Sequence, residues 1–278
     1  YTSYQIGGPA ANWGAPASED GIGEVLAIVY EADIPLYILG IGSNLLVSDK
    51  GWPGVILNLG ASLSGRRFDG TAATVMAGTR LLDLIQDAVD QGFGGMELMA
   101  GIPGSVGGAL RMNAGAFGQE IEQTTVKVKG FQLDGSPFEA GRNEINFGYR
   151  RVPQLERVVI TSGEFRFKKT AAGTLQQRMN DILALRAKKQ PLNYPSCGSV
   201  FKRPPGYYAG ALIEEAGLKG ERIGDAMVSP KHAGFILNTG KANAADVFSL
   251  IRRIEDRVWE RFGVKLEREV KLIGEFND

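Results

Sequence analysis

Apolar residues return along this chain with two spacings, and each spacing predicts one kind of element. Over residues 20–31 and 246–262 they recur every three or four positions, as on a helix with one buried face. Gly263 directly follows the second segment, which is typical of a helix that ends there. Residues 264–273 alternate apolar and polar side chains instead, which predicts a half-buried strand.

The same criteria predict the remaining elements, and the mixture of strands and helices indicates an α+β fold. Asp134-Gly135 separates two predicted strands, and this pair strongly favours a β-hairpin. In the helix expected over 81–90, Leu82, Ile85 and Ala88 should form the buried face. Further helices are expected over 175–187 and 210–216, and strands over 36–39, 55–59, 73–77, 124–133, 136–139, 158–167, 198–202 and 234–237.

Composition and charge restrict the classes of protein to consider. Hydrophobic residues make up 44% and charged residues 22%, which is typical of a folded chain. Because 31 basic residues balance 31 acidic ones, we expect no broad attraction to nucleic acid or to anionic membranes. No apolar run approaches the roughly 18 residues of a membrane span, and the first residues lack a signal-peptide pattern. The single cysteine, Cys197, excludes an internal disulfide and fits a cytoplasmic location.

Glycine is the unusual component. The 38 glycines among 278 residues are about twice the average share of roughly 7%. Each one costs backbone entropy on folding, so the excess needs a reason such as tight turns or close approach to a ligand. Because the glycines cluster at 40–42, 92–95, 101–108 and 115–118, a ligand cradle is favoured over scattered turns.

Several common catalytic motifs are missing from the sequence. Neither the G-x-G-x-x-G fingerprint of a Rossmann site nor the G-x-x-x-x-G-K-[ST] phosphate loop occurs. Cys197 and His232 are the only cysteine and histidine, so a Cys/His zinc site is excluded and we predict no metal. A structural role is expected for His232.

Two glycine-rich loops have the composition of a phosphate or flavin cradle. Residues 40–44 follow a predicted strand, where successive main-chain N–H groups can form a nest for phosphate; a plain turn is the alternative. Residues 101–109 contain four glycines and a proline, and Ile102 and Val106 should tuck this loop against a core. Its buried backbone groups then need partners, which a pyrophosphate or flavin could supply.

Seven motifs resemble the UDP-N-acetylenolpyruvoylglucosamine reductase family, and together they extend over almost the whole chain. Each is weak alone, whereas seven in the family's order are specific. They are Ile6-Gly7-Gly8-Pro9-Ala10, Gly42-Ser43-Asn44-Leu45-Leu46, residues 101–109, Met112-Asn113-Ala114-Gly115-Ala116, Tyr149-Arg150, Gly198-Ser199-Val200-Phe201-Lys202 and Glu269-Val270-Lys271-Leu272-Ile273-Gly274.

The resemblance implies an FAD-binding fold of the vanillyl-alcohol-oxidase (PCMH) type, followed by a C-terminal α+β domain that binds a UDP-sugar. With boundaries near 60 and 170, residues 1–60 and 61–170 would form two FAD-binding subdomains and 171–278 the substrate domain. The residues implied to bind FAD are Gly40, Ile41, Gly42, Ser43, Asn44, Leu45, Gly101, Pro103, Gly104, Ser105, Gly107, Gly108, Asn113, Ala114 and Gly115.

The resemblance also implies a reaction. NADPH reduces FAD, and the flavin passes hydride to C3 of UDP-N-acetylglucosamine enolpyruvate, which gives UDP-N-acetylmuramate for peptidoglycan synthesis. Ser199 matches the family's proton donor to C2, Arg150 its catalytic arginine and Glu269 its catalytic glutamate. Lys202 would contact the diphosphate, and Tyr149 the substrate or the nicotinamide.

Each of these residues has a simpler structural alternative. Ser199 could cap a turn after Gly198, and Arg150 could be a surface arginine. Tyr149 could pack in the core, and strand alternation alone places Glu269 on a solvated polar face.

The chain departs from the family pattern at two positions. Val152 stands where the family often has serine, and Lys271 where it often has arginine, so Lys271 is left without a role. The short interval between Arg150 and Ser199 resembles the family subtype that lacks a substrate-covering insertion.

Two other functions stay open. Another flavin oxidase on the same scaffold would share the glycine loops but not the 198–202 motif or Glu269, and a non-catalytic nucleotide-sugar-binding protein would be colourless. For the reductase, the expected partners are NADPH and the UDP-sugar, and we expect a cytoplasmic monomer that uses neither nucleic acid nor membrane.

Overall fold

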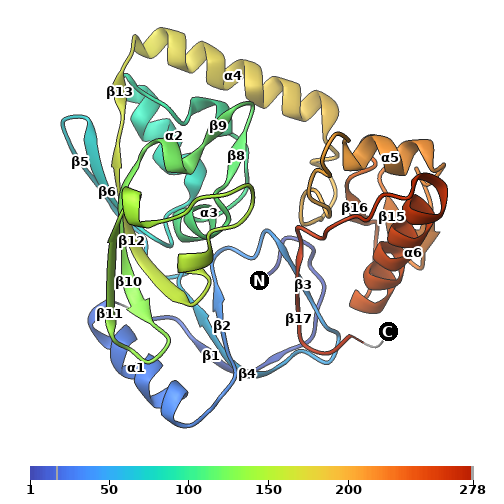
Figure 1. Cartoon of the computed structure of the whole chain (residues 1–278), viewed down its shortest axis with the longest axis horizontal. Helices are drawn as coiled ribbons and strands as arrows, with labels where there is room; N and C mark the ends of the chain where they lie inside the picture. Colours follow the sequence, from blue (N-terminus) through green and yellow to red (C-terminus); the bar gives the residue numbers. More distant parts are fainter. Residues whose placement is uncertain (17, 277–278) are drawn as a thin grey trace. The chain divides into compact units, whose positions relative to one another are not determined.

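The chain forms two compact units whose segments interleave along the sequence. The computed structural model describes residues 1–16 and 18–276 (Figure 1). The first unit contains 1–11, 42–53 and the chain from 187 onward, and the second contains 12–41 and 54–186. These two units therefore differ from the three regions predicted with boundaries near residues 60 and 170. Those boundaries stay a prediction about functional regions.

A five-stranded antiparallel sheet organises the second unit (Figure 1). Its order is β11-β10-β12-β6-β5, and β10 and β11 form the hairpin predicted at Asp134-Gly135. Gly135 has a φ of 86°, which explains the glycine at this turn. The strands are β5 (Arg66–Asp69), β6 (Ala72–Met76), β10 (Thr125–Gln132), β11 (Pro137–Gly141) and β12 (Val158–Arg166).

Two helices share a core with this sheet. Both α2 (Leu81–Asp90) and α3 (Val106–Met112) contribute buried residues to the cluster that contains Val75 of β6. The predicted buried face of α2 is wrong at Leu82, which is 40% exposed. Leu84 is buried instead, because the helix is rotated so that 81, 84, 85 and 88 face the core.

A second cluster lies under the predicted first helix. The helix α1 (Asp20–Glu31) buries Ile22 and Leu26 against Leu57 and Val159. Leu57 belongs to β4 (Trp52–Asn58), which pairs in parallel with β2 (Leu36–Leu39) in a three-stranded sheet of order β1-β4-β2. β1 spans Ala10–Gly14.

The long helix α6 (Ala244–Phe262) is the centre of the first unit. The stripe predicted from its spacing is confirmed, because Val247, Leu250, Ile251, Ile254 and Val258 are all fully buried. This stripe packs in one cluster with residues of α5 (Ala209–Glu215) and of a three-stranded antiparallel sheet. The strands of that sheet are β14 (Arg222–Ile223), β15 (Ala226–Val228) and β16 (Ile236–Asn238).

Strands from opposite ends of the sequence pair in the first unit. β3 (Leu45–Val47) is parallel to β17 (Lys271–Ile273), and Leu45 lies opposite Lys271. The strand predicted over 264–273 is therefore too long, since residues 264–270 contribute only the isolated bridge between Phe201 and Arg268. The strand predicted over 198–202 is likewise reduced to isolated bridges.

The remaining elements are short, apart from α4 (Ala172–Lys189), which begins three residues before its predicted start. They are β7 (Phe93–Gly94), β8 (Gly115–Ala116), β9 (Gln119–Glu120), β13 (Lys168–Lys169) and the 3₁₀ turns η1 (Glu97–Met99), η2 (Ile121–Gln123), η3 (Arg142–Glu144) and η4 (Pro153–Leu155).

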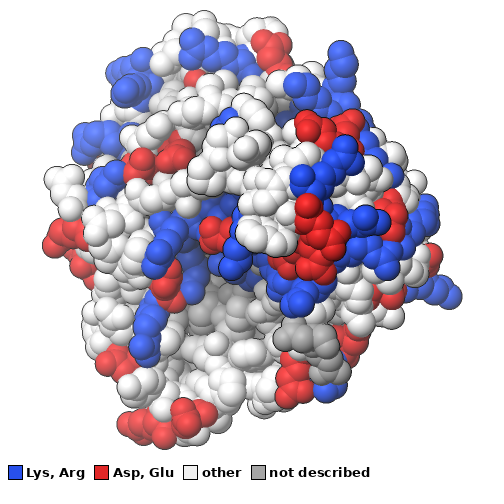
Figure 2. Space-filling view, turned by 45° about the vertical axis from the view of Figure 1, so that its right-hand side comes forward, with Lys and Arg blue, Asp and Glu red and all other residues white. Residues whose placement is uncertain are grey.

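The described helices give no support for a membrane span. No described helix combines the length and the apolar composition needed to cross a bilayer. On the face shown in Figure 2, basic and acidic side chains are interspersed. This surface agrees with the balanced formal charge of the sequence.

Side chains from two distant segments cap the start of α6. The carboxylate of Asp49 accepts hydrogen bonds from the N–H groups of Ala244 (2.8 Å) and Ala245 (3.0 Å). Asn243 Oδ1 accepts a third from Asp246 N at 2.7 Å. Asp49 thereby stabilises the helix and fastens the 42–53 segment to it.

We predict that Asp49→Ala lowers the free energy of unfolding by about 1–2 kcal/mol, because two helix N–H groups lose their acceptor and a negative charge leaves the helix N-terminus. Asp256→Ala, an exposed aspartate later on the same helix, is the control and should have little effect. Urea unfolding followed by circular dichroism measures both. Equal midpoints for the two variants would contradict the capping role.

Candidate functional site

The two glycine-rich loops meet inside the second unit through a contact that excludes a side chain. A Cβ on Gly40 would lie 2.4 Å from Ser105 Oγ, and a Cβ on Gly60 would lie 2.5 Å from the main-chain carbon of Gly40. Ser105 Oγ also accepts a hydrogen bond from Gly108 N at 3.3 Å and so caps α3. The turn at 40–41 and the loop 101–109 therefore form one structure.

The second loop is anchored to the sheet as its sequence predicted. Val106 is fully buried, and Ile102 packs against the same core. Gly107 donates its N–H to Ala77 O at 2.8 Å, and a Cβ on Gly107 would lie 2.9 Å from the Ala77 Cβ. The start of α3 thus approaches the end of β6 at a distance that only glycine permits.

Several donors in these loops are left without an acceptor. Within the part of the chain that the structure describes, no acceptor is in hydrogen-bonding geometry with the N–H groups of Gly40, Ile41, Gly104 or Ser105. The Nε atom of Arg186, which lies beside Gly101, is also buried without a partner among these residues. Unmet main-chain N–H groups in two glycine-rich loops, together with the Nε atom of Arg186, fit an anionic dinucleotide such as FAD.

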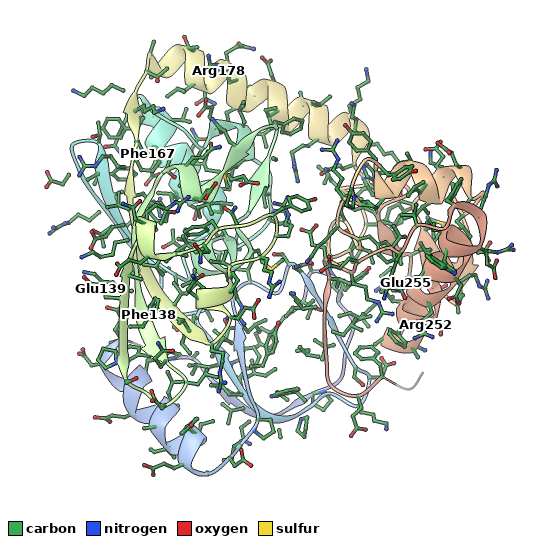
Figure 3. All side chains as sticks on the ribbon, in the orientation of Figure 1. Phe138, Glu139, Phe167, Arg178, Arg252 and Glu255 are labelled. Carbon is green, nitrogen blue, oxygen red and sulfur yellow. The ribbon has the colours of Figure 1, made fainter. Side chains whose placement is uncertain are left out.

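A buried carboxylate, that of Glu97, fixes the turn that precedes the loop 101–109. Glu97 is 3% exposed, and it accepts hydrogen bonds from Gly95 N at 2.8 Å and Arg178 Nη1 at 3.3 Å. Arg178 comes from α4 (Figure 3). Burial alone would raise the pKa of Glu97, but the hydrogen bonds outweigh it and the pKa lies below its usual value. The turn before residue 101 is therefore fixed by an ionised group.

Tyr149 and Arg150 occupy the tip of a tight turn in the second unit. Gly148 and Arg151 close the turn, with Gly148 N 2.8 Å from Arg151 O. Arg150 has a φ of 53°, a conformation that costs energy for a residue with a Cβ. Its guanidinium donates to Asn113 O at 3.2 Å and Gly115 O at 2.7 Å and lies 5.1 Å from the centre of the Tyr149 ring. Arg150 is thus more than a surface arginine, and Tyr149, which is 49% exposed, is not a core residue.

Ser199 and Glu269 are brought together in the first unit. Glu269 N donates to Val200 O at 2.8 Å, so the glutamate lies beside the residue that follows Ser199. Ser199 is exposed, and Glu269 is half-buried rather than fully solvated. Asn44 Nδ2 donates to Glu269 O at 3.1 Å, which adds the 42–46 motif to the same place.

Three other residues predicted to bind substrate or FAD also lie in the first unit, and each has a different environment. Lys202 is mostly buried along its side chain and forms an ion pair with Glu267. Leu45 is only 6% exposed and belongs to the core of β3. Gly42 has a φ of 68°, and a Cβ there would lie 2.2 Å from Tyr1 O.

The single histidine and the single cysteine are both enclosed. His232 Nδ1 accepts a hydrogen bond from Gly234 N at 3.2 Å, and burial lowers the pKa of the imidazole. This contact supports the structural role expected for His232. Burial raises the pKa of the Cys197 thiol to about 12, so the residue is an unreactive thiol.

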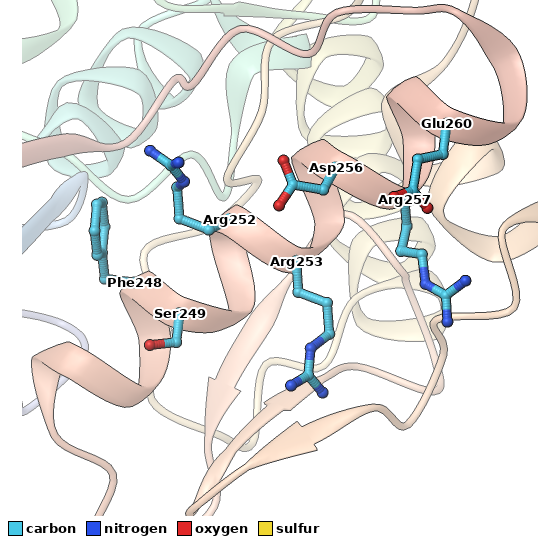
Figure 4. Close-up of a pocket in the computed structure, with 7 residues that line it drawn as sticks. All are labelled: Phe248, Ser249, Arg252, Arg253, Asp256, Arg257 and Glu260. Atoms are coloured by element: carbon cyan, nitrogen blue, oxygen red, sulfur yellow. The ribbon is translucent and has the colours of Figure 1, made fainter. Parts of the chain in front are cut away.

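No metal centre is found in the described residues. No group of three or more histidine, cysteine, aspartate or glutamate side chains there could hold a metal ion. A shallow depression runs along α6, but its arginines point in different directions (Figure 4). Arg253 pairs with Glu221, and acidic residues alternate with the basic ones. This depression has the character of a solvated helix face.

Comparison with known families gives two matches, one over the N-terminal half of the chain and one over its C-terminal third. Residues 13–139 match the FAD binding domain, and residues 190–273 match the C-terminal domain of UDP-N-acetylenolpyruvoylglucosamine reductase. The first match contains loop 101–109, and the second contains Ser199 and Glu269. The predicted fold class is confirmed, and the fold and site define a flavin-dependent oxidoreductase.

Individual relatives extend the match to the whole chain. The chain is 41% identical to a UDP-N-acetylenolpyruvoylglucosamine reductase of Agathobacter rectalis over 99% of this chain and 92% of that protein. It is 40% identical to that of Clostridium botulinum strain Hall over 100% of this chain and 91% of that protein. A crystal structure of the reductase from Thermus caldophilus superposes with a TM-score of 0.82 at 34% identity, covering 99% of this chain and 96% of that one. The chain belongs to the UDP-N-acetylenolpyruvoylglucosamine reductase family.

Sequence reasoning missed three residues that hold the site together. Arg186 and Glu97 act on the glycine loop, and Glu120 bonds to Asn113 at 2.8 Å. Glu120 lies shortly after the 112–116 motif in the sequence. This proximity to Asn113 is the signal that could have identified Glu120 as part of the site.

We predict that Gly40→Ala weakens FAD binding, because the new methyl group would displace Ser105 Oγ from the hydrogen bond by which it caps α3. Gly173→Ala is the matched control, since nothing lies within 4 Å of its Cβ position. Flavin-to-protein absorbance ratios after purification, and flavin fluorescence titration of the apoprotein, measure the effect. Equal flavin content in both variants would contradict the assignment of this contact to the cradle.

Proposed function

We propose that this protein catalyses NADPH-dependent reduction of UDP-N-acetylglucosamine enolpyruvate to UDP-N-acetylmuramate. The observation that carries the proposal is identity of about 40% to reductases of this name over nearly the full chain. The grouping of Ser199 with Glu269, two residues that resemble the family's catalytic set, supports it. Bound FAD would supply the two-electron chemistry between NADPH and the enolpyruvyl double bond.

The cradle residues are proposed to hold FAD through the main chain. The unmet N–H groups of Gly40, Ile41, Gly104 and Ser105 would donate to its polar groups, and Arg186 would add a positive charge beside Gly101. Because such donors are fixed before the ligand arrives, binding requires little rearrangement of the loop.

Arg150 is proposed to stabilise negative charge that develops on the substrate. Hydride addition to C3 moves electron density toward C2 and the carboxylate, and a guanidinium can fork onto carboxylate oxygens. The left-handed backbone at Arg150 supports this role, since strained residues that persist in a fold are often functional.

Ser199 is proposed to protonate C2. A neutral hydroxyl is a weak acid, so it serves only a strongly basic centre held at close range. Glu269 lies beside this segment and is proposed to steer the developing charge or the proton. Lys202 is proposed to bind the diphosphate, which would replace Glu267 as its ion-pair partner. The Glu267 side chain is 73% exposed.

The purified protein should carry a visible flavin absorbance. This absorbance should bleach on anaerobic addition of NADPH and return when the enolpyruvyl UDP-sugar is added, because the two half-reactions are separate. NADH and UDP-N-acetylglucosamine serve as controls for the reductant and the substrate. A flavin that NADPH reduces but the enolpyruvyl sugar does not reoxidise would overturn the proposed function.

Ser199→Ala should leave flavin reduction by NADPH within about twofold and slow reoxidation by the substrate by about 10²–10⁴-fold, as expected for loss of an acid. Stopped-flow absorbance separates the two steps. Ser249→Ala, an exposed serine of α6 in the same unit, provides the control. Equal slowing of both half-reactions would remove Ser199 from the proton-donor role.

A further inference from the structure

A small hairpin follows the cofactor motif and places a carboxylate against it. β8 and β9 pair Gly115 with Glu120, and Phe117 and Gly118 at the turn have φ values of 52° and 84°. Two positive φ values are typical of the type I′ turn that favours two-residue hairpins. A Cβ on Gly115 would lie 2.6 Å from Glu120 Cγ, so the glycine lets the Glu120 side chain pass directly over the main chain.

Asn113 receives this carboxylate. It is fully buried and has a φ of 44°. Its Nδ2 donates to Glu120 Oε2 at 2.8 Å and to Gly148 O at 3.3 Å, and its Oδ1 accepts from Glu122 N at 3.4 Å. The amide of this side chain is therefore bonded inside the protein, and Asn113 links the hairpin to residues 122 and 148.

The same contacts orient Arg150. Asn113 and Gly115 present the two carbonyl oxygens that accept from the Arg150 guanidinium. Gly148, which accepts from Asn113, also closes the turn that carries Arg150. Both the guanidinium and the backbone of Arg150 thus depend on the position of Asn113, and Glu120 makes the shorter of the two Asn113 Nδ2 contacts.

We propose that Glu120 is a positioning residue for Arg150, acting through Asn113. By holding the Asn113 amide, Glu120 keeps the carbonyls of residues 113 and 115 aligned on the guanidinium plane. The inference rests on the proposed function for the role of Arg150, but the contact chain itself lies wholly in the second unit. A bidentate cation is sensitive to small rotations, so loss of Glu120 should weaken the charge stabilisation without removing a group that touches substrate.

The decisive comparison is Glu120→Gln with Glu120→Met. The two side chains have similar volume and both fill the space over Gly115, but only glutamine keeps an acceptor for Asn113. In the FAD-loaded enzyme, E120M should slow reoxidation by the enolpyruvyl substrate by about 10–100-fold and leave reduction by NADPH within about twofold. E120Q should recover most of the lost rate.

A double-mutant cycle separates positioning from general support. If Glu120 acts through Arg150, E120M should add less than about twofold to the defect of Arg150→Ala. Glu122→Ala is the matched control, because it removes a carboxylate that pairs with Arg142 but keeps the main-chain N–H that donates to Asn113 Oδ1. Slowing by E120M of the same size in the wild-type and R150A backgrounds, or equal loss in E120Q and E120M, would overturn the proposal.

A measurement without turnover keeps the test independent of the proposed reaction. In [15N]arginine-labelled apoprotein, the side-chain N–H signal of Arg150, identified by its loss in R150K, should be sharp in wild type and E120Q and broadened in E120M. An unchanged signal in E120M overturns the inference. Failure of wild-type turnover with the expected signal changes would instead reject the proposed function and leave the positioning role standing.

Discussion

Close approach to glycine residues, at positions that leave no room for a Cβ, is the constraint on which the site depends. Gly40 lies against Ser105, Gly60 lies against Gly40, and Gly107 lies against Ala77. The same two glycine-rich loops hold main-chain N–H groups that have no acceptor among the described residues, and a charged cofactor can bond to these groups. The glycines at positions 40, 60 and 107 thus have a specific structural cause in the second unit.

Periodic patterns of apolar residues predicted most helices and strands. They failed where the length of a strand depends on its pairing with another strand rather than on burial. The spacing over 246–262 nearly coincides with α6, because a continuous apolar stripe can only be satisfied by a helix of that length. Alternation over 264–273 shows which residues are buried, but not whether a partner strand runs alongside. Only residues 271–273 have such a partner, so the predicted strand was too long.

The site was predictable where a residue type implies its chemistry and was not where a contact joins distant positions. Glycines and a proline indicated the loop 101–109, and family motifs suggested Ser199, Arg150 and Glu269 as candidates. The bond from Arg150 to Asn113 joins residues 37 positions apart, and no local pattern encodes it. A left-handed arginine is equally invisible in a sequence, since its neighbours show no special composition.

The pairing of β3 with β17 has a consequence for the order in which the protein can be completed. Leu45 is synthesised long before its partner Lys271. The second unit, which ends at Arg186, can therefore close while β3 still has an open edge. Until β17 is synthesised, that edge of β3 stays exposed, so aggregation through β3 is the hazard that this pairing removes.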